Sequence, residues 1–177
     1  MYVIFKVVLE NNASGLACVT IKKEHLNLWE GVTETDLIKY AAINTPKILP
    51  ANVKTLEETL VELLPMEARE EMEMLRNSGM IPEFPEFYVC TNKSKTNGAS
   101  VIMYRNLLKD LAKKLNEQKL YVIPSSIHEC IIAKTNDTPE DMRETISFVN
   151  NTELLPEEVL SESLYIYNAK TDELTIA

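Results

Sequence analysis

Two stretches typical of β-hairpins, one at each end of the chain, restrict the folds that this sequence can adopt. Near the start, β-branched and aromatic residues at 2–9 and 16–22 flank a short turn with two asparagines and a glycine. Near the end, the same pattern occurs in LYIYNAKTDELTIA, with a turn at Asn168 to Asp172. Because strands joined by short turns run antiparallel, these stretches favour an α+β fold, with a mainly antiparallel sheet built from hairpins and packed helices.

Helical signals dominate the segment after the first hairpin. The stretch EHLNLWEG predicts a short helical turn ended by Gly31. Thr33, with Asp36 three residues later, predicts the start of a helix near 34–44. We expect Pro46 to stop that helix, because proline removes a backbone donor and clashes with the preceding turn.

Two acidic helices are predicted on either side of Pro65, in VKTLEETLVELLP and MEAREEMEMLRNSG, with Gly79 just after the second. Met66, Met72 and Met74 belong to the second of them. Their flexible thioethers suit an adaptable binding surface, but packing in or at the edge of the core is the favoured interpretation.

A second β region begins after the proline-rich link IPEFPEF. Two strands are predicted in FYVCT and ASVIMY, and the Asn97-Gly98 pair between them favours a tight turn with positive φ. A helix follows in NLLKDLAKKLNEQ, and its inward stripe is predicted to be Leu107, Leu108, Leu111, Ala112 and Leu115.

YVIPSSIHECII, residues 121–132, is predicted to be the next strand. Thr138 before Pro139 then predicts a helix start, with a buried face formed by Met142, Ile146 and Val149. The stretch LPEEVLSES is interpreted as one more short helix. The 177 residues suit a single domain over 1–177, with a division into sub-regions 1–80 and 81–177 as the alternative.

Charge and cysteine content limit the compartment and the partners. The formal net charge of −9 opposes direct binding to nucleic acid or to an anionic membrane surface. Cys18, Cys90 and Cys130 are an odd number at wide spacing, which favours buried thiols in the cytoplasm over a disulfide framework. The start of the chain does not resemble a signal peptide, and no apolar run is long enough to span a membrane.

Metal and nucleotide sites are also disfavoured. The chain has only two histidines, His25 and His128, and none of the common metal-binding spacings. Its four glycines form neither a P-loop nor a dinucleotide-binding fingerprint. We therefore predict no metal site and no cofactor.

Within YVIPSSIHECII, the candidate catalytic residues are Ser125, Ser126, His128 and Glu129. A serine becomes nucleophilic when a base accepts its proton and a third group orients that base. In an extended strand, however, Glu129 faces away from His128, and residues two apart are roughly 6.5 to 7 Å from one another. The structural interpretation is favoured: Pro124 marks a strand entry, the serines bond backbone groups, and His128 ties the strand to a loop or helix end.

Four stretches of the chain resemble a bacterial family that is known as a domain of unknown function and is common in gut clostridia. These stretches are HLNLWEGVTETDLIKYAAINTPKILP, YVCTNKSKTNGASVIMY, YVIPSSIHECII and FVNNTELLPEEVLSESLYIY. The resemblance covers essentially the whole chain, and it implies a bacterial cytosolic protein without an established activity. It also implies longer members with residues before the counterpart of YVIFKVVLENN, so this chain is either a short member or a trimmed form. Residues of its recurring words are Asn44, Thr45, Asn92, Gly98, Ser125, Ser126, His128 and Glu129.

The sequence favours a non-enzymatic cytosolic binding or interaction domain, whose partner is a protein or a small molecule. Candidate binding residues are Asn92, Gly98 and Cys130. The alternative is a small hydrolase that uses Ser126 or Cys130 with His128, assisted by Asn92. A third hypothesis takes the acidic run at 57–73 as a mimic of nucleic-acid charge, although such a run is usually a solvated helix face. Reaction, ligand and oligomeric state are left open.

Overall fold

A six-stranded antiparallel sheet forms the body of the protein in the computed structural model, which describes residues 3–12, 15–80, 86–136, 138–152 and 155–177. The spatial order of its strands is β3-β4-β6-β5-β7-β8, and each neighbouring pair is antiparallel. Their bounds are Ala51–Thr55 for β3, Tyr88–Asn92 for β4, Lys119–Ile123 for β5, Cys130–Lys134 for β6, Tyr165–Asn168 for β7 and Glu173–Ile176 for β8. The prediction of an α+β fold with a mainly antiparallel sheet is confirmed.

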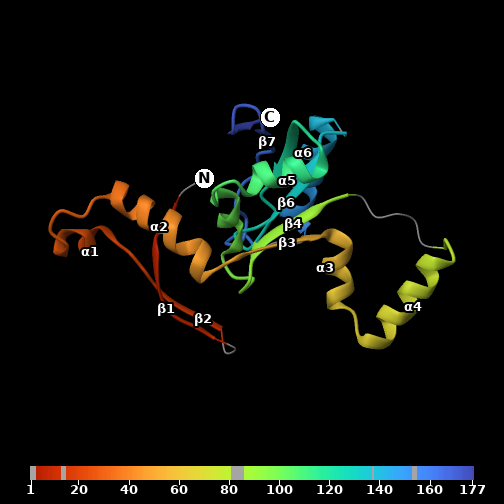
Figure 1. Cartoon of the computed structure of the whole chain (residues 1–177), viewed down its shortest axis with the longest axis horizontal. Coiled ribbons are helices and arrows are strands. Elements are labelled where there is room, and N and C mark those ends of the chain that lie inside the picture. The colour runs from red at the N-terminus through yellow and green to blue at the C-terminus, as the bar shows by residue number, and fades with distance from the viewer. Residues whose placement is uncertain (1–2, 13–14, 81–85, 137, 153–154) are drawn as a thin grey trace.

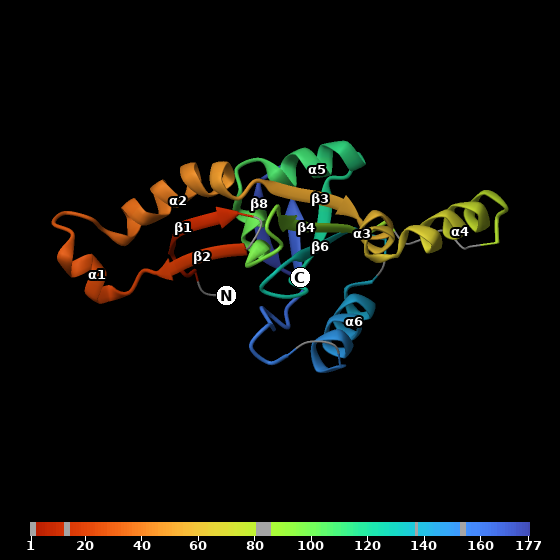
Figure 2. The same cartoon turned by 90° about the horizontal axis from the view of Figure 1, so that it is seen from below.

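Helices cover both faces of this sheet, and Figure 2 shows α5 and α6 on its opposite sides. The helix α5, Leu107–Leu115, and the 3-10 helix η1, Gly98–Met103, pack on one face. The helix α6, Pro139–Thr152, packs on the other through Met142 and Ile146. The predicted side chain of Val149 lies outside the described residues.

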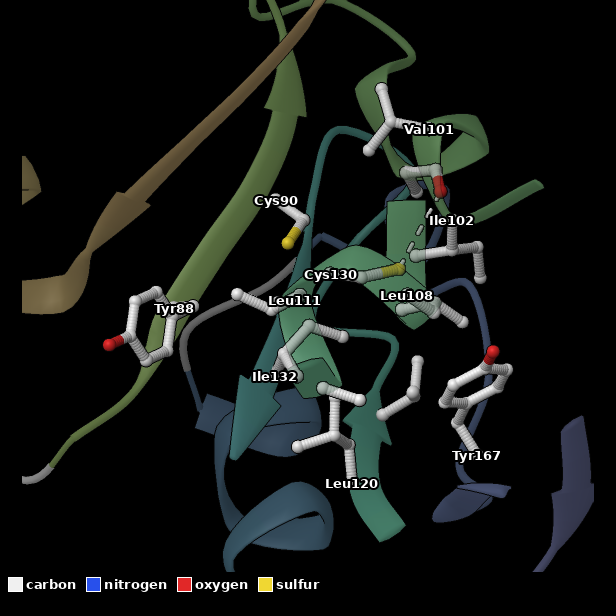
Figure 3. Packing of buried hydrophobic residues seen from close by; sticks show 13 residues of the cluster. Tyr88, Cys90, Val101, Ile102, Leu108, Leu111, Leu120, Cys130, Ile132 and Tyr167 are labelled. Carbon is white, nitrogen blue, oxygen red and sulfur yellow. Dashed lines mark hydrogen bonds between the residues drawn. The ribbon is translucent and has the colours of Figure 1, made fainter. Parts of the chain in front are cut away.

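The main core lies between the sheet and α5, and Figure 3 shows its buried side chains at close range. Leu108, Leu111 and Ala112 of the predicted stripe are buried there, while Leu107 and Leu115 pack against its edge. The amphipathic spacing of α5 therefore identified its inward face correctly.

Two arms leave the body at opposite ends, as both overall views show (Figures 1 and 2). The N-terminal arm consists of the hairpin β1, Lys6–Asn12, and β2, Gly15–Thr20, with helices α1, Lys23–Leu28, and α2, Glu34–Ile48. The acidic arm consists of α3, Leu56–Leu63, and α4, Met66–Asn77. β3 joins the two arms, because it lies between α2 and α3 in the chain.

The predicted hairpins, the short helix before Gly31 and the helix break at Pro65 are confirmed. Thr33 caps α2, since its hydroxyl accepts from the Asp36 amide while the Asp36 carboxylate accepts from the Thr33 amide at 3.0 Å. The predicted end of this helix was wrong, because α2 continues through Pro46 to Ile48. Pro46 removes one bond of the ladder, the one that its amide would make to the Ala42 carbonyl, but the helix continues for one short turn and closes with the Leu49 amide bonded to Thr45.

Two further predictions of secondary structure were wrong. ASVIMY forms η1 instead of a strand, with Ala99, Val101 and Ile102 buried against the sheet. LPEEVLSES forms a turn and no helix, because the Glu158 carbonyl accepts from Ile127 of a distant loop instead of from a residue one turn ahead. Tertiary contacts thus override local preference in both segments.

None of the three methionines of the acidic arm lies in the core, so that part of the favoured interpretation was wrong. Met72 is half-buried, and packing at the edge of the core stays a prediction for it. Met66 and Met74 are 72% and 66% exposed, and α4 has no buried residue. The link IPEFPEF falls mostly on residues 81–85, which lie outside the described residues. Within the described part of the chain, no helix is long and apolar enough to cross a membrane.

Candidate functional site

YVIPSSIHECII does not form one extended strand, which corrects the geometry expected for its polar residues. β5 ends at Ile123 and β6 begins at Cys130, so residues 124–129 form a loop between two paired strands. The Ser125 amide donates to the Ile123 carbonyl at 2.9 Å, and the Ser126 amide donates to the Glu129 carbonyl at 3.2 Å. Pro124, fully buried, starts the turn because it offers no donor to continue the ladder.

His128 links this loop to residues 91–99, and we call the contact region of 91–99 and 124–129 the junction. The Asn97 amide donates to Nδ1 of His128 at 3.2 Å. Because Nδ1 accepts, the proton of the neutral ring belongs on Nε2, which lies 3.8 Å from a Glu158 carboxylate oxygen. The imidazole therefore bridges the 91–99 segment and the segment that precedes β7.

The Ser126 side chain hydrogen-bonds the backbone of its own loop. Its hydroxyl oxygen accepts from the His128 amide at 3.0 Å, and the residue is 6% exposed. The bond of this serine thus runs to the backbone of His128 and not to its ring. Ser125 and Glu129 are half-buried, and no described contact joins either side chain to the imidazole. The geometry brings the four candidate catalytic residues into one loop without arranging them as nucleophile, base and orienting group.

Cys130 is a poor nucleophile in this position. Its thiol is fully buried and donates to the Ala99 carbonyl with a sulfur to oxygen distance of 3.7 Å. Burial raises the pKa of the Cys130 thiol to about 12, and Cys90, directly opposite on β4, has its pKa raised to about 12 by the same cause. Both thiols are protonated at neutral pH and face the core (Figure 3), where reagents do not reach them.

Asn92 shapes the 92–97 loop from within. The residue is fully buried, and its side-chain amide donates to the Thr96 carbonyl at 2.9 Å. Its side-chain oxygen accepts from the amide and the hydroxyl of Ser94. The nitrogen and the oxygen of the Asn92 side-chain amide both hydrogen-bond within the 92–97 loop, which gives this residue a structural role.

Gly98 occupies the tightest place in the junction. An added Cβ would lie 2.1 Å from the Thr91 hydroxyl, 2.5 Å from the His128 carbonyl and 2.8 Å from the Asn92 amide nitrogen. The Thr91 hydroxyl donates to the same His128 carbonyl at 2.8 Å, so the two segments meet at this point. The positive φ predicted for this pair is found at Asn97, at +50°, and not at Gly98. Glycine is required at position 98 because no side chain fits there.

A family model matches residues 1–169 and carries the description of a family of unknown function. The chain belongs to the family DUF5688. The resemblance to a family of unknown function, inferred from the four sequence stretches, is therefore confirmed. Comparisons with curated proteins and with solved structures gave no match.

In this DUF5688 member, the junction gathers most residues of the recurring words: Asn92, Gly98, Ser125, Ser126, His128 and Glu129. Thr91 and Asn97 complete it, and Glu158 contacts it from outside. The sequence predicted Asn97 only as a turn residue, and it did not indicate a role for Thr91 or Glu158. Glu158 lies in a quoted word, EEVLS, but nothing in the letters indicated that its carbonyl and carboxylate face residues 127 and 128. Among the described residues, no group of His, Cys, Asp or Glu is arranged to hold a metal ion.

Two surface grooves lie outside the junction of this DUF5688 chain. The body groove, of about 530 Å³, lies between β3 and α5, with Pro50, Val53 and Leu111 among its lining. The arm groove, of about 470 Å³, lies between the hairpin and the helices of the N-terminal arm. Its lining is mostly apolar, with Phe5, Ile21 and Leu37 among the residues, and Lys22 and Lys23 border it.

Proposed function

We propose that the chain is a protein-interaction domain whose binding surface is formed by its two arms. The observation that carries this proposal is the placement of exposed apolar side chains. Among the described residues, all the large apolar side chains that stand exposed lie before residue 81, except Met103, Leu155 and Ile176. Of the residues described before position 81, Leu49 is the only buried apolar one. Apolar surface gathered in this way is typical of an interface.

The accessible surface supports the same proposal. The chain exposes 12107 Å², whereas a compact monomer of 20.1 kDa exposes about 8,700 Å². The excess of about 3,400 Å² arises because the arms extend from the body instead of packing on it (Figure 1). A partner that covers the arms would remove this surface from water.

The arms also lack the contacts that stabilise such elements. None of the four α-helices α1 to α4 has a buried residue, and isolated helices shorter than about 12–15 residues are marginal in water. The two-stranded hairpin of β1 and β2 would also be only marginally stable on its own in water, because no third strand pairs with it in the described chain. We infer that the arms gain their stability when they bind.

The proposed partner is a protein, and the proposed location is the cytoplasm. Three free thiols, two of them fully buried, agree with a reducing compartment. The net charge of −9 disfavours nucleic acid and anionic membranes as direct partners. The contacts of Ser126, His128 and Cys130 do not support the hydrolase alternative.

Hydrogen exchange on the dilute protein tests this proposal. We expect amides of α2, α3 and α4 to exchange at least about 100-fold faster than those of α5, because local opening costs little where few apolar groups are buried. The helix α5 is the matched control, since three of its nine residues are buried in the core. Equal protection of the arms and α5 in the monomeric protein would contradict the proposal.

A further inference from the structure

The corner between α3 and α4 has the shape and chemistry to fill the arm groove of another molecule. Leu63 ends α3 and Met66 begins α4, and each is 72% exposed. Pro65 between them turns the chain, so that both apolar side chains stand on a convex corner of the acidic arm. Figure 1 shows this arm projecting away from the body.

The arm groove offers a concave apolar counterpart. It is bordered on one side by residues 3–5, just before β1, and by 20–22 at the end of β2. On the other side lie α1 and α2, whose lining residues include Leu26, Leu37 and Ile38. Ile38 is 57% exposed in the isolated chain. A volume of about 470 Å³ accommodates several side chains, and a methionine thioether adapts readily to an irregular surface.

From these features we propose that two copies of the chain form a symmetric dimer in which the α3–α4 corner of each copy occupies the arm groove of the other. This inference rests on the proposed function and names its partner. A two-fold axis makes the two contacts equivalent, so each copy contributes one groove and one corner. The position of the arms at opposite ends of the body suits this exchange (Figures 1 and 2).

Charge distinguishes this pairing from a contact between two acidic arms. The groove is lined by Lys22 and Lys23 and by one acid, Glu34, so its lining carries a net positive charge. Glu67 and Glu70 are exposed near the start of α4, while Arg69 between them turns back to bond the Leu64 and Glu62 carbonyls. Corner and groove therefore bring opposite charges together. Two acidic arms in contact would bring their glutamates together, and like charges across an interface oppose binding.

The surface area is sufficient for a stable dimer. Obligate dimers bury 2,000–5,000 Å² in total, so each partner contributes about 1,000–2,500 Å². The excess surface of this chain, about 3,400 Å², exceeds that contribution.

Sedimentation velocity on the full chain, with two single variants, tests the dimer. The wild-type protein is expected to sediment at twice the 20.1 kDa chain mass. Ile38→Asp places a charge in the groove, and Leu63→Asp places one on the corner; each is expected to raise the dimer Kd at least about tenfold. Met103→Asp is the matched control, because Met103 is 70% exposed but belongs to η1 of the body. Its dimer Kd is expected to stay unchanged.

An equimolar mixture of the two variants tests the reciprocal pairing itself. Each variant alone carries a damaged surface in both contacts of its dimer. In the mixed dimer, one contact contains both substitutions, and the other contains the intact groove of one chain and the intact corner of the other. We therefore expect the mixture to form dimers at a concentration where each variant alone is monomeric, with unchanged circular dichroism throughout.

Four results would overturn this inference. A mixture that stays monomeric would exclude the reciprocal exchange, as would equal weakening by Met103→Asp. A wild-type chain that is monomeric at about 100 μM, with rapidly exchanging arms, would exclude the dimer and leave the proposed interaction function standing. A monomeric chain with protected arms would remove both. If an aspartate variant loses its circular dichroism signal, Ile38→Ser and Leu63→Ser replace the pair in the same mixing experiment.

Discussion

Replacing Gly98 with alanine is expected to destabilise the body of the protein strongly. The new methyl group would lie 2.1 Å from the Thr91 hydroxyl, so the Thr91 bond to the His128 carbonyl must break or the two segments must separate. Overpacking of this kind costs about 1–3 kcal/mol, and the lost hydrogen bond about 0.5–1.5 kcal/mol. We therefore expect the free energy of unfolding to fall by about 1.5–4.5 kcal/mol.

Urea unfolding followed by far-UV circular dichroism measures this loss. Met103→Ala is the control, because Met103 is 70% exposed in the same 3-10 helix and its change is expected to stay within about 0.5 kcal/mol. The double variant Thr91→Ala/Gly98→Ala is expected to recover only part of the loss, since the other two close contacts are with backbone atoms. A Gly98→Ala protein within 1 kcal/mol of the wild type would refute the steric argument.

Three other predictions concern the core. Leu111→Ala is expected to cost about 2–5 kcal/mol of unfolding free energy, whereas Met103→Ala on the surface changes it by less than about 0.5 kcal/mol; urea titrations compare them. In the native protein, Cys18 is expected to react with a thiol reagent while Cys90 and Cys130 react only on unfolding, as a time course with and without urea would show. Folding raises the pKa of Cys90 and Cys130 from 9.0 to about 12, so the unfolded state loses these protons first. The stability that they contribute is complete below pH 9 and is lost as the pH rises towards 12, and a Cys90→Ala/Cys130→Ala protein should show a shallower decline of its urea midpoint over this range.

Local signals predicted the elements whose own residues determine them. Thr33 with Asp36 and Thr138 with Asp141 cap their helices as expected, because each bond spans only three residues. The apolar stripe of α5 predicted its buried face for the same reason. Hairpins at both ends were also found, since turn residues flanked by β-branched runs specify them locally.

Predictions failed where distant segments decide the structure. Val101 and Ile102 favour a strand by propensity, yet the contact of Gly98 with Thr91 and His128 turns the chain into η1. The alternation argument for the candidate catalytic residues failed because Pro124 ends β5 and starts a loop. That His128 bonds a backbone segment was nevertheless expected from the polar residues around it, whereas its partner Asn97, 31 residues away, was not.

The position of β3 between the arms has a mechanical consequence. This edge strand has five residues, and in the sheet it pairs only with β4. The N-terminal arm precedes β3 in the chain and the acidic arm follows it, so a displacement of β3 relative to β4 would move both arms together. The Tyr104 hydroxyl donates to the Leu49 carbonyl at 2.7 Å, so this bond ties the chain just before β3 to the body. Binding at either arm would therefore act on the same five-residue pairing of β3 with β4, and opening of this pairing would free both arms together.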